Sequence, residues 1–152
     1  MLSAWRIVRD KYVATAFSGE GAAEFGGRWN LPGIRVAYTS ESQSLGALEL
    51  LVHLNPPVFF KYKAIQIQFD ESLAEHVSAQ ELPPDWKAEP PSLLTQRLGS
   101  RWAEGSRSAV LAVPSVIVPQ ETNFLVNPLH PDFSRIKIGP ARNFALDPRL
   151  SR

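Results

Sequence analysis

The sequence predicts an α+β fold, a single domain with a small central sheet of mixed or antiparallel strands. Thirteen prolines and nine glycines punctuate the chain, which limits helices to a few short blocks. The short apolar or alternating segments between them are typical of strands. A length of 152 residues suits one domain, since it allows about two thirds of the unfolded surface to be buried. We therefore expect residues 1–152 to form one domain.

The first half of the chain contains three predicted strands and one predicted helix. They are, in order, strand Trp5–Val8, a glycine-rich loop over 19–33, strand Arg35–Thr39, a helix from about Ser42 to His53, and strand Phe59–Phe69. Ser40-Glu41-Ser42 offers N-cap chemistry for the helix, and Asn55-Pro56-Pro57 ends it. Apolar and polar residues alternate in the last segment, which predicts a half-buried strand.

The second half begins with a polar, proline-rich stretch over 71–91, which we interpret as an ordered surface connection. The later elements are a helix from Pro91 or Ser92 to Ala103, β segments Ala109–Val113 and Ser115–Val118, and candidate strands Thr122–Val126, Ile136–Ile138 and Phe144–Leu146. Pro114 lies between the two β segments, so we expect a bulge or a sheet edge there.

Composition and charge exclude several classes of protein. Sixteen basic and fifteen acidic residues leave a net charge of +1, which gives no general attraction to nucleic acid or anionic membranes. The absence of cysteine excludes disulfides, thiol nucleophiles and thiolate metal sites. Met1 is not followed by a basic segment and a long apolar core, and the apolar runs are too short to span a bilayer. We expect a cytoplasmic protein with no membrane span.

The glycine-rich loop is the most informative segment. Four glycines precede Arg28, and Trp29 and Asn30 follow it; the glycines are Gly19, Gly21, Gly26 and Gly27. Glycine lets backbone N–H groups approach a ligand closely, and a guanidinium offers a planar fork for phosphate or carboxylate. The pattern suits an anion-binding loop, but glycine-rich segments are more often turns, so a flexible surface loop stays open as the alternative.

A single acidic residue, Glu49, interrupts a helix that has almost no polar face. Its neighbours are Leu45, Leu48, Leu50, Leu51, Val52 and Leu54. Such a helix is normally buried, and a buried carboxylate is costly unless it has a partner. Glu49 is therefore a structural ion pair or rim residue, or else a carboxylate that binds substrate hydroxyls or stabilises developing positive charge.

Two further residues have both a structural and a functional interpretation. Tyr38 ends a short strand just before the Glu49 helix, where it is a core tyrosine or a ring that stacks on a planar ligand. Ser115 follows Pro114, where it is a turn residue or a polar group of a site. Its surroundings lack the Gly-x-Ser-x-Gly pattern of a nucleophile.

Other motif tests are negative. His53, His76 and His130 are far apart and match no ligand spacing, so we expect no metal site. Glu24 stands where a dinucleotide fingerprint requires glycine, and no Gly-Lys-Ser/Thr sequence ends a phosphate loop. Aromatic residues do not interleave with a basic run, so nucleic-acid binding by this chain alone is not expected.

The order of several motifs resembles that of the RES-domain family, named for arginine, glutamate and serine. The motifs are Trp5-Arg6, Gly19-x-Gly21-Ala22, Gly26-Gly27-Arg28-Trp29-Asn30, Ala37-Tyr38-Thr39-Ser40, Leu45-x-Ala47-Leu48-Glu49, Pro114-Ser115 and Asn123-Phe124-Leu125-Val126-Asn127-Pro128. Arg28, Glu49 and Ser115 match the three name-giving positions. The resemblance spans nearly the whole chain, although residues 71–107 carry little of it.

The resemblance implies an ADP-ribosyltransferase-like fold with NAD bound in a central cleft as substrate, not as cofactor. Arg28, Glu49 and Ser115 are then the catalytic residues. Arg28, with Gly27 beside it, holds the diphosphate or neighbouring ribose, Glu49 orients the ribose and stabilises its cation, and Ser115 positions substrate. Further substrate contacts are expected from Arg6, as a second phosphate ligand, from Tyr38, against the nicotinamide, and from Asn127.

The resemblance also implies a toxin whose partner is a cognate Xre-type helix-turn-helix antitoxin. The leading hypothesis is cleavage of the nicotinamide–ribose bond of NAD, which depletes cellular NAD and arrests growth. The alternatives are transfer of ADP-ribose to a specific cellular protein and a non-catalytic role as an antitoxin-binding co-repressor subunit. The acceptor, whether water, phosphate or protein, and the oligomeric state, homo-oligomer or toxin–antitoxin hetero-oligomer, stay open.

Overall fold

The computed structural model describes residues 1–54 and 60–151. One seven-stranded sheet runs through them in the order β4-β5-β6-β2-β1-β3-β7. The strands are β1 (Leu2–Arg9), β2 (Ala37–Ser40), β3 (Tyr62–Phe69), β4 (Ala74–His76), β5 (Val110–Pro114), β6 (Thr122–Val126) and β7 (Lys137–Phe144). β4 and β5 are parallel and every other neighbouring pair is antiparallel. The predicted α+β fold with a mixed central sheet is confirmed.

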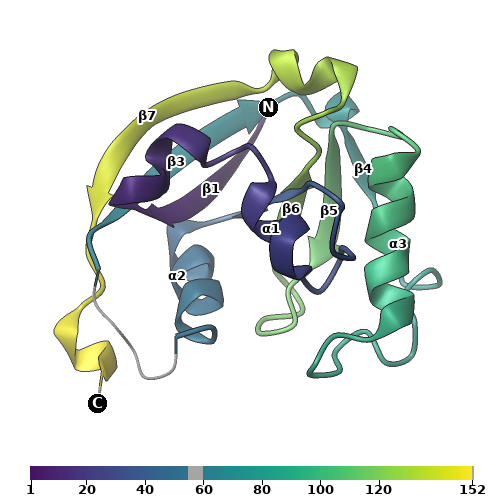
Figure 1. Ribbon diagram of the computed structural model, residues 1–152, viewed down its shortest axis with the longest axis horizontal. Helices are drawn as coiled ribbons and strands as arrows, with labels where there is room; N and C mark the ends of the chain where they lie inside the picture. Colours follow the sequence, from purple (N-terminus) through teal and green to yellow (C-terminus); the bar gives the residue numbers. More distant parts are fainter. Residues whose placement is uncertain (55–59, 152) are drawn as a thin grey trace.

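Three α-helices and four short 3₁₀ turns connect the described strands (Figure 1). The helices are α1 (Glu20–Phe25), α2 (Gln43–Leu51) and α3 (Leu93–Glu104), and the 3₁₀ turns are η1 (Asp10–Thr15), η2 (Glu71–Leu73), η3 (Pro131–Arg135) and η4 (Pro148–Ser151). Ser42 caps α2 by accepting a hydrogen bond from the Leu45 N–H, and Ser92 caps α3 through Thr95. Side-chain caps of this kind satisfy amides that the helix leaves unpaired.

Several sequence predictions were wrong in detail. Residues 19–33 include α1, which Gly19 opens at φ 75°, a conformation that costs glycine little. Residues 71–91 include β4. Residues 115–118 form no strand, because the Ser115 hydroxyl accepts hydrogen bonds from the N–H groups of Ile117 and Val118 and so folds a turn.

The last predicted strands and the predicted end of the first helix also differ from the structure. The two candidate strands near 136–146 are one strand, β7, whose mostly exposed side chains at the sheet edge leave no apolar pattern to read. Helix α2 ends at Leu51, two residues before the predicted end. The predicted stop Asn55-Pro56-Pro57 and the predicted strand residue Phe59 lie outside the described residues.

Helix α2 is less buried than its composition predicts. Only Leu45 among its residues is buried, while the side chains of Leu48 and, just beyond the helix, Val52 are 41% and 61% exposed. The helix rests on the sheet through Gly46, where an added Cβ would lie 3.1 Å from the Cδ1 of Ile7. The apolar residues of α2 therefore do not indicate a fully buried helix. The helix approaches the sheet closely along one line, and leucines of the helix stay at the surface.

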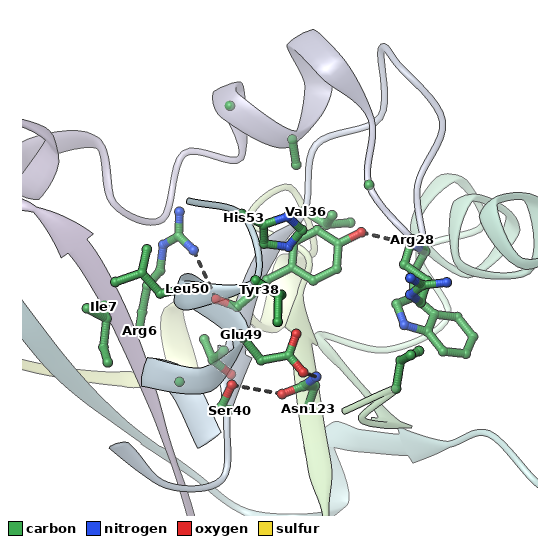
Figure 2. Close-up of a pocket in the computed structure, with 18 of the residues that line it drawn as sticks. Arg6, Ile7, Arg28, Val36, Tyr38, Ser40, Glu49, Leu50, His53 and Asn123 are labelled. Carbon is green, nitrogen blue, oxygen red and sulfur yellow. Dashed lines mark hydrogen bonds between the residues drawn. The ribbon is translucent and has the colours of Figure 1, made fainter. Parts of the chain in front are cut away.

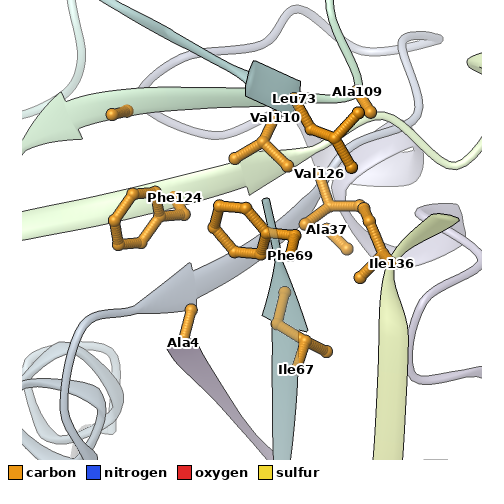
Figure 3. Packing of buried hydrophobic residues seen from close by; sticks show 11 residues of the cluster. Ala4, Ala37, Ile67, Phe69, Leu73, Ala109, Val110, Phe124, Val126 and Ile136 are labelled. Atoms are coloured by element: carbon orange, nitrogen blue, oxygen red, sulfur yellow. The ribbon is translucent and has the colours of Figure 1, made fainter. Parts of the chain in front are cut away.

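The core fixes the centre of the sheet from both faces. On one face, Phe69 of β3 packs edge to face on Phe124 of β6 with ring centroids 5.5 Å apart (Figure 3). On the other, Trp102 of α3 packs with Leu111 and Leu125. Each such buried side chain contributes roughly 1.5–3 kcal/mol relative to exposure. β2 and β6, which carry site residues, both contribute buried side chains to this core.

Candidate active site

A cavity of about 810 Å³ opens between the glycine-rich segment, strand β2, helix α2 and residues 87–91. That volume lies in the usual range for a small-molecule site. Five of the seven predicted site residues line it, namely Arg6, Gly27, Arg28, Tyr38 and Glu49. Figure 2 shows that the side chains of Arg6, Tyr38, Glu49 and Arg28 converge from different elements.

Helix α3 holds the glycine-rich segment in place. An added Cβ on Gly99 would lie only 1.9 Å from the Trp29 carbonyl oxygen, so the helix packs directly on the loop backbone. The Gln96 amide donates to the Gly27 carbonyl over 3.0 Å, and the Leu31 N–H donates to the Ser100 hydroxyl over 2.9 Å. Contacts with α3 therefore hold the backbone of the loop that carries Arg28.

Arg28 binds its own chain. Its Nη1 donates to the carbonyl oxygens of Trp86 and Ala88, at 3.1 and 2.6 Å. Nη2 donates to the Glu89 carboxylate at 2.8 Å. These acceptors lie on residues 86–91, which we call the strap, and Lys87, Glu89 and Pro91 of the strap line the cavity. The guanidinium thus forms part of the cavity wall while it fastens the strap.

Tyr38 is fixed by its hydroxyl, which accepts from the Trp29 N–H at 3.1 Å and donates to Asn30 Oδ1 at 2.6 Å. Burial raises the pKa of the Tyr38 phenol above its usual value, so the group stays protonated and can donate. An added Cβ on Gly27 would lie 2.7 Å from this hydroxyl. Glycine at this position therefore makes room for the tyrosine, which also lines the cavity.

Glu49 is held by one carboxylate oxygen. Its Oε1 accepts from the Ser115 hydroxyl at 2.8 Å and from the Asn123 amide at 3.0 Å. Asn123 is itself held, because its Oδ1 accepts from the Ser40 hydroxyl at 2.8 Å. Oε2 accepts no hydrogen bond from the described residues, which leaves it for a ligand. Neutral donors thus orient the carboxylate and leave its charge uncompensated, an arrangement suited to a developing cation.

Ser115 is fully buried and does not line the cavity. Its hydroxyl donates to Glu49 and accepts from two backbone N–H groups of the turn that follows. The structure thus connects Ser115 to the site through its hydrogen bond to Glu49.

Arg6 projects from β1 toward the cavity. Its Nη1 donates to the Tyr38 carbonyl oxygen at 2.9 Å, and its Nε donates to the Ala16 carbonyl. Burial lowers the pKa of Arg6 to about 10, which still leaves it charged at neutral pH. Among the described residues it has no carboxylate partner. A desolvated cation of this kind favours an anion in the cavity beside it.

Asn127 requires a correction, because the structure does not place it in the cavity. Its buried amide donates to the Ala103 carbonyl at the end of α3, and its Oδ1 accepts from the Leu129 N–H. Both groups are engaged in the scaffold, where they join the end of β6 to α3. The motif that contains Asn127 contributes to the site through Asn123 instead.

Sequence reasoning missed Asn30 and Asn123 as supporting residues and the strap as a cavity wall. Both asparagines stand in the quoted motifs, directly beside or near the predicted residues, so the signal was present. His53 also lines the cavity, just after α2. The strap gave no signal because its main contacts to Arg28 are backbone carbonyls, which any sequence supplies.

In residues 1–54 and 60–151, no group of three or more histidine or acidic side chains is placed to hold a metal ion. Within the same residues, no helix is long and apolar enough to cross a membrane.

The RES domain family model matches residues 3–147, and the chain therefore belongs to the RES-domain family. The Prs ADP-ribosylating toxin of Sphingobium sp. is 44% identical, over 99% of this chain and 97% of that protein. Toxin Res of Photorhabdus laumondii is 39% identical, over 96% and 95%. The membership predicted from the motifs is confirmed.

A solved structure shares the fold. A chain of the M. tuberculosis MbcT–MbcA toxin–antitoxin complex matches with a TM-score of 0.76, covering 99% of this chain and 86% of that one. At 17% identity the likeness concerns the fold alone. It extends over all the elements that build the cavity.

Proposed function

We propose that this protein binds NAD in the cavity and breaks its nicotinamide–ribose bond. The observation that carries the proposal is Glu49, a carboxylate anchored through one oxygen and open through the other, facing a cavity that two arginines and a tyrosine also line. An N-glycosidic bond to a cationic nicotinamide breaks through an oxocarbenium-like state. A fixed carboxylate lowers the energy of that state without first protonating the leaving group.

The remaining residues have matching roles. Arg6 and Arg28 bind the two phosphates, and Tyr38 packs its ring against the nicotinamide. The bonding electrons leave with the nicotinamide, which becomes neutral, and the ribose C1′ is captured by an oxygen nucleophile that then loses a proton. Ser115 and Asn123 hold Glu49 in position during this step.

The relatives support the wider biological proposal. One of them is named an ADP-ribosylating toxin, another is named Toxin Res, and the structural neighbour comes from a toxin–antitoxin complex. We propose that this chain is likewise a toxin that acts in the cytoplasm, arrests growth by consuming NAD, and is neutralised by a cognate Xre-type antitoxin.

The first test is incubation of the purified protein with NAD, with and without phosphate, followed by chromatography of nicotinamide and of the ribose product. Release of nicotinamide by the native protein and its loss in Glu49→Ala supports the proposal. Glu24→Ala is a matched control, because Glu24 is exposed and does not line the cavity. Full activity in Glu49→Ala would exclude the proposed site.

A second candidate is transfer of ADP-ribose to a cellular protein, which the name of the Sphingobium relative favours. NAD labelled in the adenosine part separates the two reactions. Transfer leaves label on a macromolecule in a cell extract, whereas hydrolysis or phosphorolysis leaves it only on small products.

The co-repressor alternative is tested in cells that express the antitoxin separately. Growth arrest that Glu49→Ala abolishes, while the complex with the antitoxin still forms, supports the enzyme. Arrest that survives this substitution contradicts it.

A further inference from the structure

Three groups of the strap accept hydrogen bonds from Arg28, and one of them is charged. Trp86 and Ala88 offer backbone carbonyls, whereas Glu89 offers a carboxylate. Trp86 also packs on Trp29 with ring centroids 6.3 Å apart, so the strap is attached independently of the ion pair. The Glu89 contact is therefore one of several that hold the strap in place.

The ion pair lies at the lip of the cavity. The Arg28 side chain is 17% exposed and that of Glu89 is 73% exposed, and both residues line the cavity. A carboxylate in such an exposed position is easily displaced, since ion pairs of this kind contribute little free energy. The guanidinium is the more fixed partner, because the two carbonyls hold it from the other side.

The donors of Arg28 limit what it can bind. A guanidinium has five N–H groups, and Nη1 directs its two to the strap carbonyls. An oxyanion must therefore bind through Nη2 and Nε, and Nη2 is the atom that now donates to Glu89. Arg6 differs, since among the described residues it has only carbonyl partners.

We propose that Glu89 sets the affinity of the Arg28 site for phosphate groups. Its carboxylate binds the Arg28 guanidinium within the chain, and an incoming diphosphate displaces it. The inference rests on the proposed function for its biological ligand. Its physical content is a competition between two anions for one guanidinium. A diphosphate, which carries more charge than one carboxylate and also reaches Arg6, displaces Glu89, whereas a singly charged ligand competes poorly.

The test measures binding of inorganic pyrophosphate by calorimetry to the full chain and to Glu89→Gln. Glutamine keeps an oxygen that accepts from Arg28, so the strap contact is retained while the charge is removed. We expect about two- to fivefold tighter binding by Glu89→Gln, the size of effect usual for an exposed ion pair.

Glu20→Gln is the matched control. Glu20 also lines the cavity, but it has no basic partner among the described ion pairs, so its substitution removes the same charge without freeing a guanidinium. A larger gain in Glu89→Gln than in Glu20→Gln supports direct competition. Equal changes would mean that only the general potential of the cavity matters, and would overturn the proposal.

A second comparison keeps the proposal testable if Glu89→Gln alters the strap. In an Arg28→Lys background, the substitution Glu89→Gln should lose most of its effect, because the forked donor is gone. An undiminished effect would contradict the assignment to Arg28, as would failure of every variant to bind pyrophosphate. These outcomes do not depend on NAD cleavage, so failure of the proposed function would be recognised separately by nicotinamide release.

Discussion

The two charged walls of the cavity are built in opposite ways. On the carboxylate wall, neutral donors from Ser115 and Asn123 hold one oxygen of Glu49 and leave the other open. On the arginine wall, the chain supplies carbonyls and an opposite charge to Arg28. The Glu49 carboxylate is thus oriented with its charge intact, whereas the Arg28 guanidinium is oriented with its charge partly neutralised.

This difference fits a division of labour between chemistry and binding. A group that stabilises a transition state works best when it is fixed and uncompensated. A group that binds substrate must also release product, and a built-in competitor weakens binding without disturbing geometry.

The largest effect is expected from Glu49→Gln. The substitution keeps the shape and the hydrogen-bond acceptor but removes the negative charge to which the proposed reaction assigns stabilisation of the ribosyl cation. We expect the rate of nicotinamide release to fall by about 10²–10³, as for other preorganised electrostatic groups. Thermal unfolding should change little, and a rate near that of the native protein would show that the charge is not used.

The next effect concerns stability of the arginine wall. Gly99→Ala places a Cβ 1.9 Å from the Trp29 carbonyl oxygen, so α3 and the loop must separate. We expect a loss of about 1–3 kcal/mol in the free energy of unfolding, typical of overpacking. Chemical denaturation measures it. Gly21→Ala is the control, since a Cβ there meets no atom within 4 Å, and an equal loss in both variants would contradict the close-packing argument.

Ser115→Ala removes one of the two anchors of Glu49 on the carboxylate wall. We expect kcat to fall about tenfold with KM nearly unchanged, because orientation of a catalytic group affects the chemical step. Asn123→Ala removes the other anchor and should act in the same direction. The double variant should be non-additive, since both residues act on one carboxylate; a change in KM alone would instead assign Ser115 to substrate binding.

The smallest effect is expected from Tyr38→Phe, at the junction of the two walls. The ring remains, but the buried Asn30 oxygen loses its donor, which should cost about 1 kcal/mol of stability. If the ring packs on the nicotinamide, the rate of nicotinamide release should stay within about threefold of the native rate. Tyr38→Ala should lower the rate further, and equal loss in both variants would assign the role to the hydroxyl.

The sequence could predict the residues that face the cavity but not all of their partners. Arg28 and Glu49 stand out because glycines and leucines surround them, and such contrasts are local. The strap and the Asn123 contact depend on residues about sixty or more positions away from Arg28 and Glu49, which no local pattern reveals. Asn127 was misplaced because a motif groups neighbours in sequence, whereas on a strand and the turn after it such neighbours serve different parts of the fold.

The helices and strands likewise include some that the sequence could predict and some that it could not. β3 could be predicted because apolar residues alternate with polar ones along most of it, although Ala64 and Ile65 are adjacent and both buried. α2 could be predicted because Ser42 caps it. β7 could not be predicted, because an edge strand with exposed side chains carries no hydrophobic period. β4 has only three residues and pairs in parallel with β5, so its existence depends on that partner.

The anchoring of Glu49 has a consequence for the chain as it leaves the ribosome. Its two partners follow it by 66 and 74 residues, so they are made long after the helix that carries it. A nascent chain that ends before Ser115 has the carboxylate but neither of the two residues that orient it, and one that ends before Asn123 lacks the second. In a cell that translates this protein, the oriented carboxylate therefore forms only once synthesis is nearly complete and the strands at the centre of the sheet have paired.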